Sequence, residues 1–129
     1  MATVVVNGGK GIVTNRIKGA GTEPLNIGWG TGAGTAAATD TTLFTEALVT
    51  LAGGTTDHTA GASTQQTTTT ANDTYQVTGT RSATGAGTVT NAGLWDAASG
   101  GNLFLKGDFV GIGLASGDSI AFTIKAIFA

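Results

Sequence analysis

The sequence predicts an all-β fold: a single-domain, antiparallel β-sandwich or jelly roll with at most one short helix. The chain has 129 residues, the length of one domain, and its 22 glycines and many threonines favour short strands joined by turns. It combines 40% hydrophobic with only 11% charged residues, which is typical of a folded chain. Turn signals recur at a spacing that matches roughly eight or nine strands, as in a sandwich, a jelly roll or a small barrel.

The N-terminal segment is predicted to form a hairpin. In "TVVVNGGKGIV" the pair Asn7-Gly8, which tolerates positive φ, separates two apolar runs. Residues 1–22 are therefore expected to form an N-terminal hairpin, either on the same chain or extended and exchanged with a neighbouring copy. Pro24 fits a turn or a sheet edge, and extended chain is expected to resume over Leu25 to Trp29.

The middle of the chain is predicted to hold the one helix and a loop. Asp40 suits the N-cap of a helix of one or two turns, and Glu46 lies near enough to assist it. The stretch "LFTEALVTL" then returns to a strand-compatible pattern. Residues 53–63, "GGTTDHTAGAS", are small and polar and are bounded by glycine, which is typical of an exposed loop.

The C-terminal half carries the clearest strand signals. Every second residue from Tyr75 to Gly79 faces one side, and polar residues face the other. The segments "TVTNAGLW" and "NLFLKGDF" flank a turn over residues 97–101 and predict a second hairpin. In the last segment Lys125 guards the wetter face from aggregation. The opposite face of that segment is apolar: Ile120, Phe122, Ile124, Ala126 and Phe128.

Charge and composition exclude several classes of function. A net charge of -2 with scattered cations leaves no basic face for a phosphate backbone, so nucleic acid is not expected as a partner. The apolar stretches fall far short of the roughly 18 to 20 residues that cross a bilayer, and no signal segment precedes Ala2. A soluble, unexported chain without a membrane partner is therefore expected. One histidine and no cysteine supply neither a zinc site nor thiolate chemistry.

Residues 32–37, "GAGTAA", match the G-x-G-x-x-A pattern of dinucleotide-binding proteins. The pattern binds a pyrophosphate only where a helix begins and points its amides at the ligand. Threonines, which are poor helix formers, follow it here. We therefore interpret these residues as a flexible loop and expect no cofactor.

The polar residues form no recognisable catalytic or metal-binding set. A catalytic triad with His58 would need a serine in a nucleophile-elbow pattern, and the sequence has none. His58 is therefore expected to be solvent-exposed in its loop. Glu23 and Glu46 would serve a glycosidase only about 5 to 9.5 Å apart in a cleft, an arrangement that the sequence leaves open. Without calcium-loop spacing, three aspartates are expected to cap turns: Asp96, Asp108 and Asp118. We expect no catalytic, cofactor-binding or metal-binding residues, and a protein that is not an enzyme.

Three segments resemble small virion structural proteins of tailed bacteriophages: "EPLNIGWGTGAGTAAATDTTLFTEA", "TTTTANDTYQVTGT" and "TVTNAGLWDAASGGNLFLKGDFVGIGLASGDSIAFTIKAIFA". The similarity covers most of the chain from Glu23 to Phe128, apart from residues 48–66. Proteins of this group belong to phage heads or tails. The resemblance therefore implies a virion component that is assembled in the host cytoplasm, and it brings no catalytic residues.

The resemblance implies a capsid decoration or cement protein that binds the major capsid protein and forms a homo-oligomer, for which a trimer is expected. The alternative is a tail-fibre, baseplate or receptor-binding module, in which the loop around His58 and the threonine-rich segment face the host. A small hydrolase or a sugar-binding lectin is a third class. Binding a capsid lattice takes an apolar patch of about 800 Å² per partner. The candidates for this patch are Trp29, Phe44, Trp95 and Phe104. The alternative for each of them is a position in the hydrophobic core.

Overall fold

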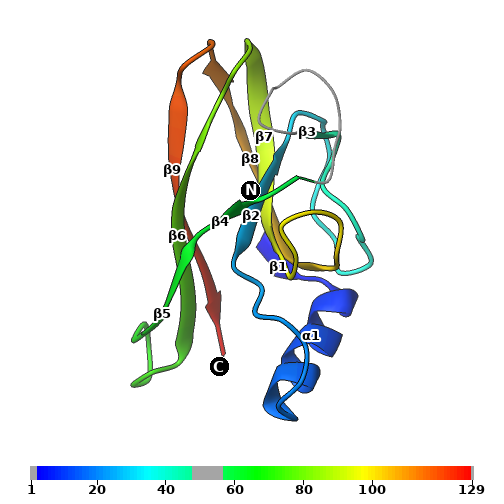
Figure 1. The fold of residues 1–129 in the computed structure, drawn as a ribbon, viewed down its shortest axis with the longest axis vertical. Helices are drawn as coiled ribbons and strands as arrows, with labels where there is room; N and C mark the ends of the chain where they lie inside the picture. The colour runs from blue at the N-terminus through cyan, green and yellow to red at the C-terminus, as the bar shows by residue number, and fades with distance from the viewer. Residues whose placement is uncertain (1–2, 48–56, 129) are drawn as a thin grey trace.

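The computed structural model describes residues 3–47 and 57–128. Within these residues one helix and nine strands follow one another (Figure 1). The first part of the chain holds β1 (Thr3–Val5), α1 (Asn7–Ile17), β2 (Asn26–Gly30), β3 (Glu46–Ala47) and β4 (Thr59–Ala60). The second part holds β5 (Ala62–Gln66), β6 (Thr74–Ser82), β7 (Gly87–Trp95), β8 (Leu103–Leu114) and β9 (Ser119–Ile127).

The strands form two antiparallel sheets that pack as a β-sandwich, which confirms the predicted all-β class. The larger sheet has six strands in the order β1-β8-β7-β2-β3, and β4 pairs with β2 as well. The smaller sheet has three strands in the order β5-β6-β9. Figure 1 shows the smaller sheet on the left and the larger sheet beside it, with α1 at the lower end.

The core lies between the two sheets. One cluster of buried side chains joins both sheets: Ile27, Leu94, Leu105, Val77 and Ala126. Beside it, the fully buried ring of Trp29 meets Phe122 edge to face, with ring centroids 6.4 Å apart. Because each buried large side chain contributes about 1.5 to 3 kcal/mol, this contact surface is the main source of the sandwich's stability.

The strand predictions for the C-terminal half are confirmed. β6 pairs with β9 without a break from Thr74↔Ile127 to Ser82↔Ser119. Exposed residues alternate with half-buried or buried ones along β9 and along the second half of β6. β7 and β8 form the predicted hairpin. Its turn is closed by Asp96, whose Oδ1 accepts a hydrogen bond from the Asn102 backbone N–H at 2.6 Å. Extended chain also resumes where expected, as β2.

The predicted N-terminal hairpin is wrong, because a helix follows the first strand. β1 pairs with β8 of its own chain, and α1 begins at Asn7. A side chain at Gly9 would collide with the backbone of Phe104, so glycine permits the helix to lie directly against β8. Ile12 is buried against the core from the same helix face. Packing on β8 thus outweighs the poor helix propensity of glycine.

The helix predicted at Asp40 is wrong as well. The chain forms turns there, and the Asp40 carboxylate accepts hydrogen bonds from the Ala37 backbone N–H and from Lys106 Nζ, both at 3.0 Å. The carboxylate therefore closes a turn and binds Lys106 of β8, and it does not cap a helix. Of the strand predicted in "LFTEALVTL", β3 covers Glu46–Ala47, and residues 48–51 lie outside the described residues.

The exposed loop predicted for residues 53–63 is wrong where the structure describes it. Residues 57–63 contain β4 and the start of β5, and Asp57 forms an isolated β-bridge with Ser99. His58 is buried. The small polar residues of this segment therefore build sheet structure against β2 and β6. Residues 53–56 lie outside the described residues.

Candidate functional site

One side of the sandwich exposes the unpaired edges of two strands, and we call it the open side. β8 and β9 are consecutive in the chain but belong to different sheets. The turn between them contains Gly117 at φ 93° and is closed by Asp118, whose Oδ2 accepts the Ala115 backbone N–H at 2.8 Å. β1 covers β8 only over residues 105–107. Within the described residues, no strand pairs with β8 beyond that point on the side of β1, nor with β9 on the side away from β6.

The open side is mostly apolar, with Lys125 and two threonines among the residues that line it. Val110 on β8 is 90% exposed, and Ile112 two residues later is 41% exposed. Between the two sheets on this side lies a groove of about 320 Å³. Its lining comes from both sheets and includes Ala92, Leu105, Phe109, Phe122 and Ile124. Exposed apolar residues beside unpaired backbone are typical of a surface that binds another protein.

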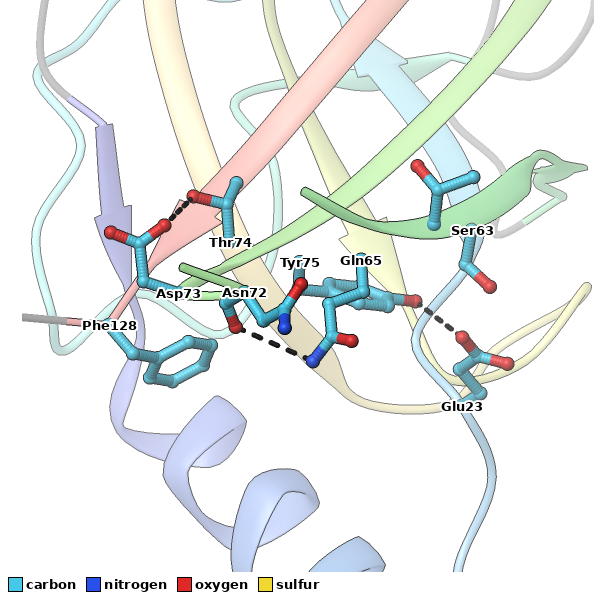
Figure 2. Close-up of a pocket in the computed structure, with 9 residues that line it drawn as sticks. Glu23, Ser63, Gln65, Asn72, Asp73, Thr74, Tyr75 and Phe128 are labelled. Carbon is cyan, nitrogen blue, oxygen red and sulfur yellow. Dashed lines mark hydrogen bonds between the residues drawn. The ribbon is translucent and has the colours of Figure 1, made fainter. Parts of the chain in front are cut away.

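A second cavity, which we call the terminal cleft, lies at the end of the molecule where Phe128, which follows β9, comes close to α1. One part of it has a volume of about 370 Å³, and its lining includes Glu23, Gln65, Asn72, Tyr75 and Phe128. In Figure 2 the Tyr75 hydroxyl points toward Glu23. The Tyr75 hydroxyl lies 3.2 Å from both Glu23 Oε1 and the Pro24 carbonyl oxygen. Phe128 is 53% exposed, so its ring offers an apolar surface to solvent.

The titratable groups of the terminal cleft are held in structural hydrogen bonds. The Asp73 carboxylate accepts the backbone N–H groups of Thr70, Thr68 and Thr69 at 2.8 to 2.9 Å. These bonds, that of Thr70 above all, hold the pKa of Asp73 far below its ordinary range. Burial and the neighbouring carboxylate of Glu23 raise the pKa of Tyr75. Asp73 therefore stays ionised and Tyr75 neutral, and the cleft suits binding better than proton transfer.

His58 lies in a buried polar cluster and not in the exposed position that was predicted. Its Nδ1 is 2.8 Å from the Ala97 carbonyl oxygen, and its Nε2 is 2.6 Å from Glu46 Oε1. The ring stacks on Trp95 with centroids 4.6 Å apart. Because a carbonyl oxygen only accepts a hydrogen bond, the contact with Ala97 requires a proton on Nδ1. Because both ring nitrogens are in hydrogen bonds within the domain, the role of His58 is structural.

Arg81 is a second buried polar residue that sequence reasoning missed. It is 2% exposed, and its guanidinium lies over the Trp29 ring, 5.0 Å from the centroid. The group donates to the backbone oxygens of Ile27 at 2.7 Å and Ala47 at 3.4 Å. Burial lowers the pKa of the guanidinium, while the nearby carboxylates oppose that shift. The alternation that begins at Tyr75, extended to Arg81, is the signal that places this side chain inside.

Three of the four residues expected on an interface patch are buried in the domain itself. Trp29 is 0%, Phe104 2% and Trp95 3% exposed, so each occupies the core position that was its alternative. Phe44 is partly buried, and the Lys106 ammonium lies 3.1 Å from its ring centroid. The apolar residues that the structure does expose are others: Ile17, Val110, Ile112, Ile127 and Phe128.

The remaining candidate residues have structural roles. Glu23 precedes β2, whereas Glu46 pairs with Gly30 at its far end, so the structure places them in separate clusters. Asp96 and Asp118 cap turns as predicted. Asp108 differs, because its Oδ1 accepts the backbone N–H of Ala36 at 2.8 Å and fixes a distant loop. Within the described residues, no three acidic or histidine side chains gather into a possible metal site.

The dinucleotide-like motif over residues 32–37 is followed by a turn and not by a helix. The loop is tied down, because the Gly32 N–H donates to the Phe44 carbonyl oxygen and Ala36 is held by Asp108. A loop therefore lies where one was predicted, and contacts with Phe44 and with Asp108 of β8 hold it in place. Among the described residues, no helix is long and apolar enough to span a membrane. Comparison with protein-family models, with curated proteins and with solved structures found no match for this chain.

Proposed function

We propose that this chain is a non-enzymatic structural protein of a bacteriophage virion, a capsid decoration or cement protein that stabilises the head lattice. The observation that carries the proposal is the open side, where β8 presents Val110 and unpaired backbone beside an apolar groove. The resemblance of the sequence to small virion proteins supports it. In this proposal the partners are the major capsid protein and further copies of the chain.

The open side suits a lattice partner for two reasons. An extended segment of a capsid protein adds to an open strand edge through backbone hydrogen bonds, which require no particular side chains. The groove beside that edge takes apolar side chains from the same segment and gives the contact its selectivity. Because the contact is repeated over the head surface, a modest free energy per copy sums to a large stabilisation of the shell.

The most sensitive test compares two variants, each at an exposed apolar residue, for their binding to phage heads. Val110→Asp places a charge on the open edge of β8, and Ile17→Asp places one on α1, where the residue is 81% exposed. Neither change touches the core. We expect Val110→Asp to abolish binding to heads assembled without the chain, and Ile17→Asp to bind as the original does. Complete heads should also release their DNA at a higher temperature than heads without the chain.

A second candidate, a tail or receptor-binding module, is favoured by the terminal cleft. Aromatic rings beside amide and carboxylate groups form the kind of cavity that binds a small polar ligand at a host surface. Ile17 lies beside this cleft. The same pair of variants separates the candidates, because loss of host-cell binding through Ile17→Asp, with heads indifferent to Val110→Asp, would overturn the decoration role.

A further inference from the structure

The outer edge of β9 presents a regular row of backbone groups to solvent. The Ala83 N–H donates to the Asp118 carbonyl oxygen and the Phe128 N–H to that of Asp73, so even-numbered residues of the β9 ladder bond to β6. In an antiparallel ladder the intervening residues turn their N–H and C=O groups to the other side. Five residues of β9 therefore point these groups outward: Ser119, Ala121, Thr123, Lys125 and Ile127.

The row is compatible with a second copy of itself. When two β9 strands run antiparallel about a two-fold axis at Thr123, Thr123 meets its own copy, and Ala121 meets Lys125 of the second copy. The single charge of the strand thus never faces itself. On the inner face Phe122 meets Ile124 of the second copy. Thr–Thr and aromatic–β-branched pairs of this kind are favourable across antiparallel strands.

We propose that two copies of the chain associate through β9, antiparallel and centred on Thr123, and so join their smaller sheets into one continuous sheet. The outward N–H and C=O groups of each β9 then find partners on the other copy. Because a two-fold contact closes on itself, it gives a dimer, whereas the trimer expected from the resemblance requires a contact between two different surfaces. The inference is independent of the virion role.

The other edges of the described sheets are poorer candidates for this contact. β1 has three residues, and β5 has an exposed polar sequence, "ASTQQ". β8 is irregular, with register shifts between Val89 and Asn91 and between Leu94 and Trp95 on its partner strand. β9 is the regular edge, with nine residues, no proline and one charge. Bulges, short length and charge hinder regular pairing with an identical strand, and β9 combines a long unbroken register with a single charge.

The test is the mass of the full chain in solution, by sedimentation equilibrium up to about 1 mM protein. We expect a reversible dimer, at twice the 12.6 kDa of the chain. Ala121→Lys places a new ammonium group opposite Lys125 twice per dimer and should weaken association roughly twofold to thirtyfold. Ala121→Glu, the matched control at the same exposed site, should not weaken it, and Ala121→Lys with Lys125→Glu should restore it.

A backbone variant tests the same contact without charge. Thr123→Pro removes an N–H that points away from β6, so the fold should persist and association should fall at least about tenfold. Thr123→Ser keeps the N–H and should still dimerise. A monomer throughout, a trimer, or a dimer indifferent to both Ala121→Lys and Thr123→Pro would each overturn the inference. Head binding through Val110 is read separately, so the two proposals fail independently.

Discussion

Arg81 links the two sheets, so its replacement should destabilise the whole sandwich. The residue belongs to β6 of the smaller sheet, and its guanidinium donates to backbone oxygens of β2 and β3 in the larger one. Arg81→Leu places a shorter, apolar side chain at this buried position. It removes the donors and leaves the carbonyl oxygens of Ile27 and Ala47 in a buried region without the partner that they now have.

The structure sets the size of this loss. The bond to the Ile27 oxygen, at 2.7 Å, is charge-assisted and contributes about 1.5 to 3 kcal/mol. The position over Trp29 adds about 0.5 to 2 kcal/mol. Burial of the charge opposes both gains, because it disfavours the ionised guanidinium. We therefore expect Arg81→Leu to lower the free energy of unfolding by about 2 to 4 kcal/mol, a large share of the roughly 5 to 15 kcal/mol of a typical domain.

The assay is urea unfolding followed by tryptophan fluorescence, since Trp29 lies directly beneath the guanidinium. Arg81→Lys keeps the charge without the fork of donors and should fall between the original chain and Arg81→Leu. Lys18→Ala removes an exposed cation and should change the free energy of unfolding by less than about 0.5 kcal/mol. If Arg81→Leu were as small in effect as Lys18→Ala, the contacts of the guanidinium would have no energetic role.

Three further predictions concern stability. Lys106→Met should lower the free energy of unfolding, measured in urea, by about 2 to 4 kcal/mol, because the buried ammonium donates to Asp40 and to the Thr42 carbonyl oxygen. The double variant Lys106→Met with Asp40→Asn should lose less than the sum of the two single variants. Trp95→Ala should cost about 3 to 5 kcal/mol in the same assay, through lost packing of a buried ring on His58; an unchanged midpoint would contradict this. Hydrogen bonds hold the pKa of Asp40 and of Asp73 below the ordinary value; for Asp40 the bond from the Ala37 backbone N–H has the largest effect. Below about pH 4 the unfolded chain therefore binds more protons than the folded chain does. The melting temperature should therefore fall as the pH drops through that range, and it should fall less steeply in Asp40→Asn than in the original chain.

Sequence reasoning succeeded where the signal is local. The alternation of β6 and β9 has a period of two and states directly which face is buried. The β7-β8 hairpin is indicated by two apolar runs and the glycines at its turn, Gly100 and Gly101, which adopt φ of 64° and 81°. These elements specify themselves, so one sequence suffices to predict them.

Sequence reasoning failed where distant contacts decide the structure. The segment "NGGKGIVTNRI" has weak helix propensity and becomes α1 because Gly9 fits closely against the backbone of Phe104 and Ile12 reaches the core. Asp40 looks like an N-cap locally, but Lys106 of β8 and the turn at Ala37 take its carboxylate. No pattern within either segment reveals these partners.

The buried polar cluster shows the same division. His58 and Glu46 come together because β3 and β4 both pair with β2, a topology that their spacing in sequence does not indicate. Without that topology, a lone histidine among small polar residues is most simply interpreted as exposed. Arg81 is different, since the β6 alternation already places it on the buried face. Its burial was predictable, whereas its partners were not.

The crossing from β8 to β9 explains why the candidate surfaces lie on one side. Had these two strands paired, as consecutive strands usually do, each would have covered the edge that the other leaves open. The turn at Gly117 instead carries the chain to the other sheet, so both edges remain unpaired, with the groove between them. Val110 then stands on the irregular edge, and Thr123 at the centre of the regular one. An irregular edge suits a partner that adapts to it, and a regular, self-compatible edge suits an identical copy, which is why we assign them to different partners.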